Sequence, residues 1–193
     1  MKPIRRILTI ALLCMLPFSL AACGGGGGGD AFGNAATDFF ANAKSSLEAE
    51  GRPFNNVYSS QPGQALTNTF FEWNITNIRK ETDIDGITPA AGNVFIVADT
   101  KSTNVFDESI PVGNYDFHLL YEEDGEIVEV LALEEFADGM YPDNVMEAPG
   151  ESVEGFLVFE APEATQAAML TYYEIWDDDF EGDTYYFEVN VSN

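Results

Sequence analysis

Hydrophobic and polar residues alternate with a period of two along most of the chain from Val57 onward. Alternation places successive side chains on opposite faces of a strand, so it is typical of a half-buried β-sheet. Residues rich in Gly, Pro, Asn and Asp separate the alternating segments, and Glu-Glu-Asp-Gly over 122–125 has the composition of a hairpin turn. The pattern predicts about seven strands, at 71–75, 94–98, 115–121, 126–133, 153–160, 169–175 and 185–191.

The connections between these strands decide the fold class. Parallel strands need crossovers of about a dozen residues or more, usually helical, and no such helical segment lies between the predicted strands. We therefore expect an all-β, antiparallel β-sandwich over residues 57–193. The alternation predicts that the space between its two sheets is filled by Phe95, Val97, Phe156, Val158, Phe187 and Val189.

Residues 34–51 follow a different period, because Phe39, Ala43 and Leu47 recur at every fourth position and Gly51 follows them. Spacing of this kind predicts a short helix. A helix lying on a membrane surface needs Lys or Arg on its polar face, whereas acids predominate here. We expect this helix to dock on the folded domain.

The first 22 residues have the layout of a bacterial export signal, with three basic residues ahead of an apolar run over 7–20. The run ends in Leu-Ala-Ala before Cys23, which resembles the lipobox at which bacteria attach a diacylglyceryl group to the cysteine and cleave the chain. We expect residues 1–22 to be a lipoprotein signal peptide and Cys23 to carry the lipid. Residues 23–33 then form a glycine-rich tether, because six consecutive glycines have no side chain to bury. The protein is expected on the bacterial cell membrane, facing outside the cytoplasm.

Charge and composition exclude several classes of function. The chain holds 33 Asp and Glu against 8 Lys and Arg, a net charge of -25, so nucleic acid is not expected as a direct partner. Hydrophobic residues make up 46% of the chain, too many for a disordered acidic polymer. His118 is the only histidine and lies within a predicted strand, and no Gly-x-Ser-x-Gly motif accompanies it. We assign no catalytic residue.

Three stretches of the sequence resemble a known family. They are PGESVEGFLVFEAP over 149–162, followed by Leu-Thr-Tyr, then GNVFIVADT over 92–100, and DFHLL over 116–120. They are similar to a bacterial lipoprotein family catalogued as a domain of unknown function, some of whose members carry the name telomeric repeat-binding factor 2. The resemblance covers about residues 57–193. It implies an immunoglobulin-like sandwich, of the kind seen in immunoprotective extracellular antigens, anchored outside the membrane by lipid, and it carries no catalytic residue.

The sequence departs from this family pattern in two ways. Strands in the family are commonly rich in Lys, whereas the last 92 residues here contain 24 acids and no Lys or Arg. The tract over 134–145 is also long for a hairpin connection. Two glycines within the family stretch have structural interpretations: Gly150 suits a turn, and Gly155 suits a bulge or a close approach of two strands.

An acidic turn is predicted between the last two strands, where five carboxylates occur within residues 177–183. Calcium takes six to eight oxygen ligands, and Asp177, Asp179, Glu181 and Asp183 offer them at alternate positions. The spacing does not match the EF-hand loop. A solvated acidic turn without a metal is the alternative.

Two pairs of adjacent tyrosines are candidates for a binding surface. Alternation leaves one ring of each pair, Tyr172 with Tyr173 and Tyr185 with Tyr186, facing away from the core. Exposed aromatic rings near a sheet edge can mark a recognition site. Packing of these rings beneath the predicted helix is the alternative.

Together these features predict a lipid-anchored, non-enzymatic binding or structural module of the bacterial cell envelope. Its partners would be the membrane, through Cys23, and an envelope or extracellular protein or polymer. Two other classes stay open: a calcium-dependent adhesion module using residues 177–183, and an envelope hydrolase using a pair of carboxylates.

Overall fold

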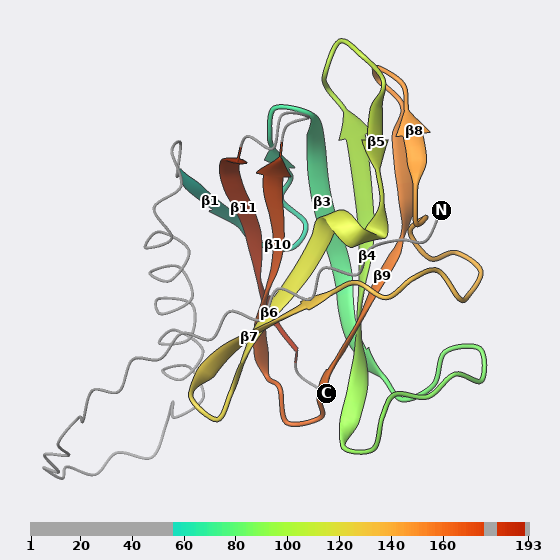
Figure 1. The fold of residues 1–193 in the computed structure, drawn as a ribbon, viewed down its shortest axis with the longest axis vertical. Helices are drawn as coiled ribbons and strands as arrows, with labels where there is room; N and C mark the ends of the chain where they lie inside the picture. The colour runs from blue at the N-terminus through green and yellow to red at the C-terminus, as the bar shows by residue number, and fades with distance from the viewer. Residues whose placement is uncertain (1–55, 176–180, 192–193) are drawn as a thin grey trace, which may run out of the picture.

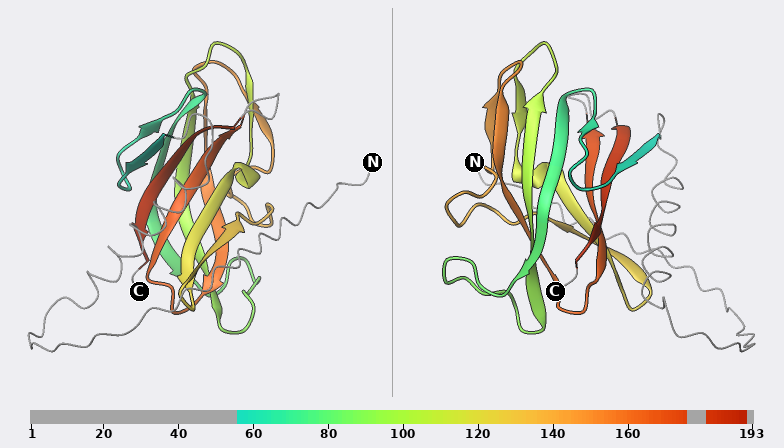
Figure 2. Two further views of the ribbon diagram at one scale, coloured as in Figure 1. Left: turned by 60° about the vertical axis from the view of Figure 1, so that its left-hand side comes forward. Right: turned by 180° about the vertical axis from the view of Figure 1, so that it is seen from behind.

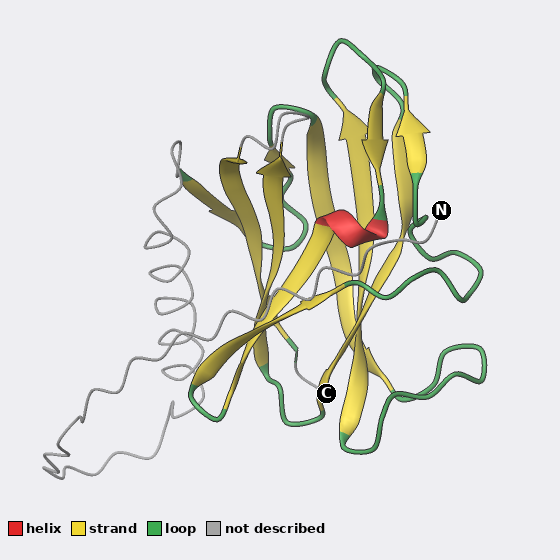
Figure 3. Ribbon diagram, in the orientation of Figure 1, coloured by secondary structure: helices red, strands yellow, loops and turns green. Residues whose placement is uncertain are grey.

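A computed structural model describes residues 56–175 and 181–191 of the chain. In this part, two sheets of five and four strands form the two layers of a sandwich, and a separate two-stranded pair extends from one end (Figure 1, Figure 2). Strands are its main secondary structure and are joined by loops and turns, with a single short 3-10 helix among the described residues (Figure 3). The predicted signal peptide, Cys23, the tether and the helix over 34–51 all lie outside the described residues.

The five-stranded sheet has the order β1-β11-β10-β6-β7, formed by Val57–Ser60, Glu181–Asn190, Ala167–Ile175, Phe117–Glu123 and Glu126–Leu131. The four-stranded sheet has the order β2-β3-β4-β9, formed by Leu66–Thr67, Phe71–Glu81, Asn93–Asn104 and Ser152–Pro162. The small pair consists of β5 and β8, Ile110–Val112 and Val145–Glu147, and the 3-10 helix η1 is Asn114–Asp116. The predicted all-β sandwich is confirmed. Neighbouring strands pair antiparallel in the described residues, with one exception, since β1 runs parallel to β11.

Large aromatic side chains fill the space between the two sheets. The ring of Trp73 lies 4.9 Å from that of Phe117 and 4.8 Å from that of Phe187, between centroids. The indole N–H of Trp73 donates to Thr100 Oγ1 at 2.9 Å, so the buried indole keeps its hydrogen bond. Burial of such rings supplies much of the apolar area that stabilises a sandwich without disulfides.

The predicted core is right for β11 and wrong for β4 and β9. Phe187 and Val189 lie between the sheets as expected. Phe95, Val97 and Val158 are buried on the opposite, outer face of the four-stranded sheet, and Phe156 is partly buried beside them. The residues of β4 and β9 that face the sandwich core are Ile96, Ala98, Leu157 and Phe159. The physical reason is that both faces of these strands are covered, so their apolar runs carry no alternation that could fix the register.

The long connection over residues 132–144 is what covers that outer face. Ala137 and Met140 pack onto the apolar patch on β4 and β9. The segment also pairs with the edge of β9, because the Leu133 amide donates to Val158 O at 2.8 Å and the Tyr141 amide donates to Phe156 O at 2.9 Å. Its unusual length is therefore explained: it covers a sheet face and closes a sheet edge.

A buried polar cluster fixes the far end of this connection. The Glu147 carboxylate is fully buried and accepts hydrogen bonds from Ser102 Oγ at 3.0 Å and the Asn104 amide at 3.2 Å. The Tyr141 hydroxyl lies 2.6 Å from the same Ser102 Oγ. Burial raises the pKa of Glu147, and the hydrogen bonds from Ser102 and Asn104 act against that rise. The cluster ties β8 and the covering segment to β4.

Candidate functional site

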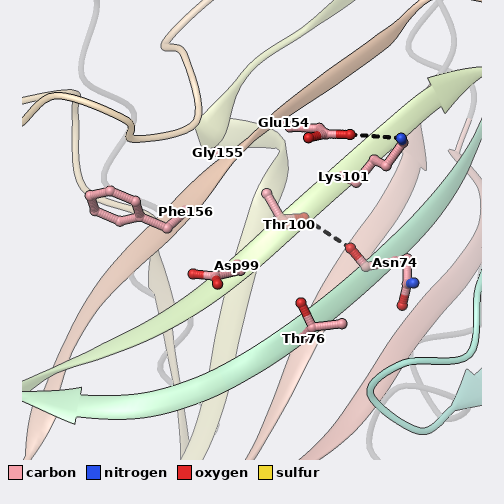
Figure 4. A pocket seen from close by; sticks show the side chains of 8 residues that line it. All are labelled: Asn74, Thr76, Asp99, Thr100, Lys101, Glu154, Gly155 and Phe156. Atoms are coloured by element: carbon pink, nitrogen blue, oxygen red, sulfur yellow. Dashed lines mark hydrogen bonds and ion pairs between the residues drawn. The ribbon is translucent and has the colours of Figure 1, made fainter.

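A groove opens on the outer face of the four-stranded sheet. It encloses about 550 Å³ and is lined by Asn74, Thr76, Asp99, Thr100, Lys101, Glu154, Gly155 and Phe156 (Figure 4). The lining comes from three adjacent strands, β3, β4 and β9. Phe156 also borders the apolar patch beneath residues 132–144. The groove thus begins where the covering segment ends.

A β-bulge in β3 places two polar side chains next to Asp99. The register of β3 against β4 shifts between Thr76 and Arg79, and Asn77 within the bulge has a φ of 48°. Such a bulge inserts an extra residue and redirects the side chains that follow it. As a result Asn77 Nδ2 donates to Asp99 Oδ2 at 3.0 Å, and Arg79 Nη1 donates to Asp99 Oδ1 at 2.9 Å.

Arg79 is held from three sides. Besides Asp99, its Nε donates to Glu81 Oε1 at 3.1 Å. Its guanidinium carbon lies 5.9 Å from the centroid of the Phe156 ring, within the range of a cation–π contact. A guanidinium fixed in this way can hold Asp99 and Phe156 in place at the edge of the groove.

A second ion pair crosses the groove between β4 and β9. Lys101 lies directly opposite Glu154 in the register, and Lys101 Nζ is 2.7 Å from Glu154 Oε1 (Figure 4). Both side chains are at least half exposed, so this pair adds little to the stability of the fold. It places a donor and an acceptor side by side on an open surface.

Positive charge is concentrated on this sheet. Within the described residues the cations are Arg79, Lys80 and Lys101, and all three belong to β3 or β4. The groove carboxylates Asp99 and Glu154 are therefore each paired with a cation. On a molecule whose net charge is -25, this groove is a locally balanced polar site.

One acceptor beside the groove has no partner. Asn74 Oδ1 is buried and makes no hydrogen bond within the part of the chain that the structure describes. Buried polar atoms are nearly always hydrogen-bonded in native proteins, to protein or to ordered water. Donors, acceptors and an aromatic edge in one groove suit a ligand that offers hydroxyl or amide groups.

Each tyrosine pair has one ring on the outward face of its sheet, as the alternation predicted, but these outward rings do not form the expected exposed surface. Tyr172 and Tyr185 are buried between the sheets, with exposures of 7% and 6%, and Tyr186 is 2% exposed on the other face of the five-stranded sheet. Tyr173 is partly buried, and its ring packs against the His118 ring at a centroid distance of 4.9 Å. Alternation gives the face on which a ring lies but not whether that face is covered, which is why the prediction failed.

The predicted calcium ligands fall mostly outside the described residues. This applies to Asp177 and Asp179 and to the side chain of Glu181. Asp183 is described, and its Oδ1 accepts hydrogen bonds from the backbone amide and from Nδ2 of Asn56, each at 3.1 Å. Among the described residues, no group of three or more His, Cys, Asp or Glu side chains is placed to hold a metal ion. The calcium site stays a prediction.

The single histidine lies in strand β6, as the sequence indicated. His118 Nδ1 is 2.9 Å from Glu129 Oε1 on the neighbouring strand β7.

The groove itself was not predicted from the sequence, because its side chains occupy what look like ordinary solvent-facing strand positions. The available signal was the gathering of cations at 79, 80 and 101 in a chain otherwise rich in acids.

A family model described as "Domain of unknown function (DUF4352)" matches residues 60–182, which include the whole groove. The chain belongs to the DUF4352 family. This confirms the resemblance to a lipoprotein family of unknown function. None of the curated proteins matches this DUF4352 chain.

Solved structures of similar fold come from bacteria. One is ycdA, a candidate lipoprotein of Bacillus subtilis, with a TM-score of 0.52 and 14% identity over 69% of this chain. The DUF4352 chain spans 40% of the length of that structure. Another is MPT63, a secreted protein of Mycobacterium tuberculosis, with a TM-score of 0.50 and 15% identity, covering 67% of this chain and 97% of MPT63. At these identities the likeness concerns the fold.

No helix among the described residues is both long enough and apolar enough to cross a bilayer.

Proposed function

We propose that this DUF4352 chain is a non-catalytic binding module, tethered by lipid outside the cytoplasmic membrane, whose groove on β3, β4 and β9 binds an uncharged, hydroxyl-rich chain such as a glycan. The observation that carries this proposal is the local charge balance of the groove on a strongly acidic molecule.

The sign of the charges selects the ligand class. A polyanion is repelled by the net charge of -25. A cationic ligand is attracted to acidic surface throughout the molecule. At the groove it would be repelled by the positive charges of Arg79 and Lys101. An uncharged polar chain is neither repelled nor drawn elsewhere by these charges, and it can form hydrogen bonds directly with the paired donors and acceptors.

The arrangement of the acids favours binding over hydrolysis. A glycosidase needs two carboxylates facing one bond from opposite sides. Here the strand register sets Lys101 opposite Glu154, and Phe156 opposite Asp99. Each groove carboxylate therefore faces a cation or a ring across the strands.

Binding to the groove is tested by an NMR titration of the full chain, isotopically labelled, in a zwitterionic detergent. Titration with an N-acetylglucosamine pentasaccharide should shift amide signals of β3, β4 and β9. Asp99→Ala should weaken binding about tenfold, because a charge-assisted hydrogen bond is worth about 1.5 kcal/mol or more. Glu122→Ala, at an exposed position near the end of β6 in the other sheet, is the matched control. Tighter binding to polyphosphate than to any uncharged oligosaccharide would contradict the proposal.

The anchor is tested separately through Cys23. Cys23→Ala should move the protein from the membrane fraction to the soluble fraction, or leave an uncleaved precursor, because the acidic domain itself is repelled by anionic lipids. Unchanged mass and membrane retention would show that Cys23 is not lipidated.

A further inference from the structure

The outer face of the five-stranded sheet carries an apolar patch formed by Leu120, Met169 and Tyr186. Their exposures are 4%, 0% and 2%. Leu119 and Leu170, their neighbours along β6 and β10, belong to the core between the sheets. Since alternate side chains of a strand point to opposite faces, the patch points away from that core.

Burial of this patch requires a second layer over it. A side chain standing on a sheet is shielded at its base and by its neighbours, but its tip reaches water unless something packs on top. Met169 exposes nothing. The partly buried residues around it, Val57, Ile127, Ala167 and Tyr173, all come from strands of the same sheet. Within 56–175 and 181–191, therefore, this cluster contains no residue from an overlying element.

We propose that residues 34–51 form this layer: an amphipathic helix whose stripe of Phe39, Ala43 and Leu47 docks over Leu120, Met169 and Tyr186. The chain enters the sheet at β1, which is the edge strand beside β11, and Val57 at its start belongs to the margin of the patch. The occupant is thus the segment that immediately precedes the sheet.

The connecting chain is long enough for this placement. Residues 52–55 separate the predicted helix from the described domain. Four extended residues reach about 14 Å at most. Strands in a sheet lie about 4.8 Å apart, so β11 and β10 are about 5 and 10 Å from β1. The connection therefore lets the helix lie over β11 and β10.

The dimensions of the two surfaces also agree. Tyr186, Met169 and Leu120 lie on the adjacent strands β11, β10 and β6, and Met169 is directly opposite Leu120. The patch therefore extends about 10 Å across the sheet. In a helix, Phe39 and Leu47 are about 12 Å apart along the axis. One apolar stripe of two turns covers the three strands.

This docking sets the orientation of the molecule. The helix and its tether would leave from the outer face of the five-stranded sheet, whereas the groove lies on the outer face of the four-stranded sheet, on the other side of the sandwich. A tethered domain would then turn its groove away from the membrane. The inference is independent of what the groove binds.

The test compares two charge-matched variants of the full chain in a zwitterionic detergent. Leu47→Asp places a carboxylate on the apolar stripe, and Ser45→Asp places one on the opposite side of the predicted helix. We expect amide hydrogen exchange in β10 and β11 to accelerate about tenfold or more in Leu47→Asp and to stay unchanged in Ser45→Asp, since removing a packed layer promotes local opening. Equal behaviour of the two variants would overturn the proposal.

Disulfide trapping provides a second measurement that does not depend on how Leu47→Asp folds. In a chain carrying Cys14→Ser and Cys23→Ser, the pair Ala43→Cys with Met169→Cys should cross-link within one chain under mild oxidation. Ala43→Cys with Thr76→Cys, on the far sheet, should not. A cross-link formed between two chains, detected at twice the mass, would show that a second copy covers the patch and would overturn the proposal.

Discussion

At the scale of single residues, Asp116 is an acid whose charge is disfavoured by its surroundings. It lies in η1, where its Oδ2 accepts a hydrogen bond from the Gly113 amide at 2.8 Å. Burial raises the pKa of Asp116 to about 6, although the hydrogen bond from Gly113 and the charge of His118 act to lower it. The folded state therefore binds a proton that the unfolded chain releases at lower pH. This contribution to stability is fully present below the ordinary carboxyl pKa of 3.8 and is lost as the pH rises through about 6.

Asp116→Asn should therefore stabilise the protein at neutral pH. The amide keeps an oxygen for the Gly113 amide and has no charge to bury, so we expect the free energy of unfolding at pH 7 to rise by about 1 to 3 kcal/mol. The gain should shrink toward zero as the pH falls to about 4. Urea unfolding at several pH values measures it, with Asp107→Asn at an exposed position as the control. A variant that is less stable than the parent at pH 7 would show that the Asp116 charge is stabilising.

At the scale of elements, the connection over residues 132–144 depends on one glycine of the neighbouring strand. A Cβ added to Gly155 would lie 2.5 Å from Tyr141 N and 2.7 Å from Tyr141 Cα. The predicted close approach at Gly155 is thus confirmed, and the contact is to the backbone of the covering segment. The predicted turn at Gly150 is confirmed as well, since its φ is 77°.

Gly155→Ala should loosen this segment from β9. The backbone of Tyr141 must move to admit the methyl group, which we expect to cost about 1 to 3 kcal/mol of unfolding free energy. Hydrogen exchange of the Tyr141 amide, which donates to Phe156 O, should accelerate more than that of the Lys101 amide within β4. Unchanged protection at Tyr141 would mean that the segment is held elsewhere, through the Glu147 cluster.

How far the elements follow from the sequence depends on their length and on which faces are covered. The seven long strands carry alternation or apolar runs bounded by turn residues, and all were predicted. The short strands β1, β2, β5 and β8 have two to four residues, too few for a period to be visible. Faces were misassigned in β4 because its apolar run is covered on both sides. The groove was missed because only the register brings Lys101 opposite Glu154, and the bulge brings Arg79 to Asp99.

At the scale of the whole molecule, the net charge of -25 should weaken the folded state by self-repulsion. Salt screens charges over about 8 to 10 Å at physiological ionic strength. Salt also weakens the partly exposed ion pairs at the groove. Their attraction is small compared with the mutual repulsion of 33 acidic residues. Screening should therefore stabilise the protein overall.

We expect the melting temperature of the full chain to rise with sodium chloride. At matched ionic strength, magnesium and calcium should then act alike if screening is the whole effect. An additional rise in calcium that disappears in Asp179→Asn with Asp183→Asn would support a calcium site in residues 177–183. If calcium does no more than sodium at equal ionic strength, the calcium-dependent adhesion module is ruled out.

The parallel pairing of β1 with β11 has a mechanical consequence. Val57 lies beside Thr184 and Ser60 beside Phe187, so the chain enters β1 at one end of the pair and leaves β11 at the other. Tension between the chain before residue 56 and the chain after residue 191 therefore acts along both strands in opposite directions. Such a load shears the hydrogen bonds between the two strands together instead of unzipping them one after another. A tethered domain pulled through its first strand would therefore unfold abruptly. The force needed would be set by the hydrogen bonds between β11 and the four residues of β1.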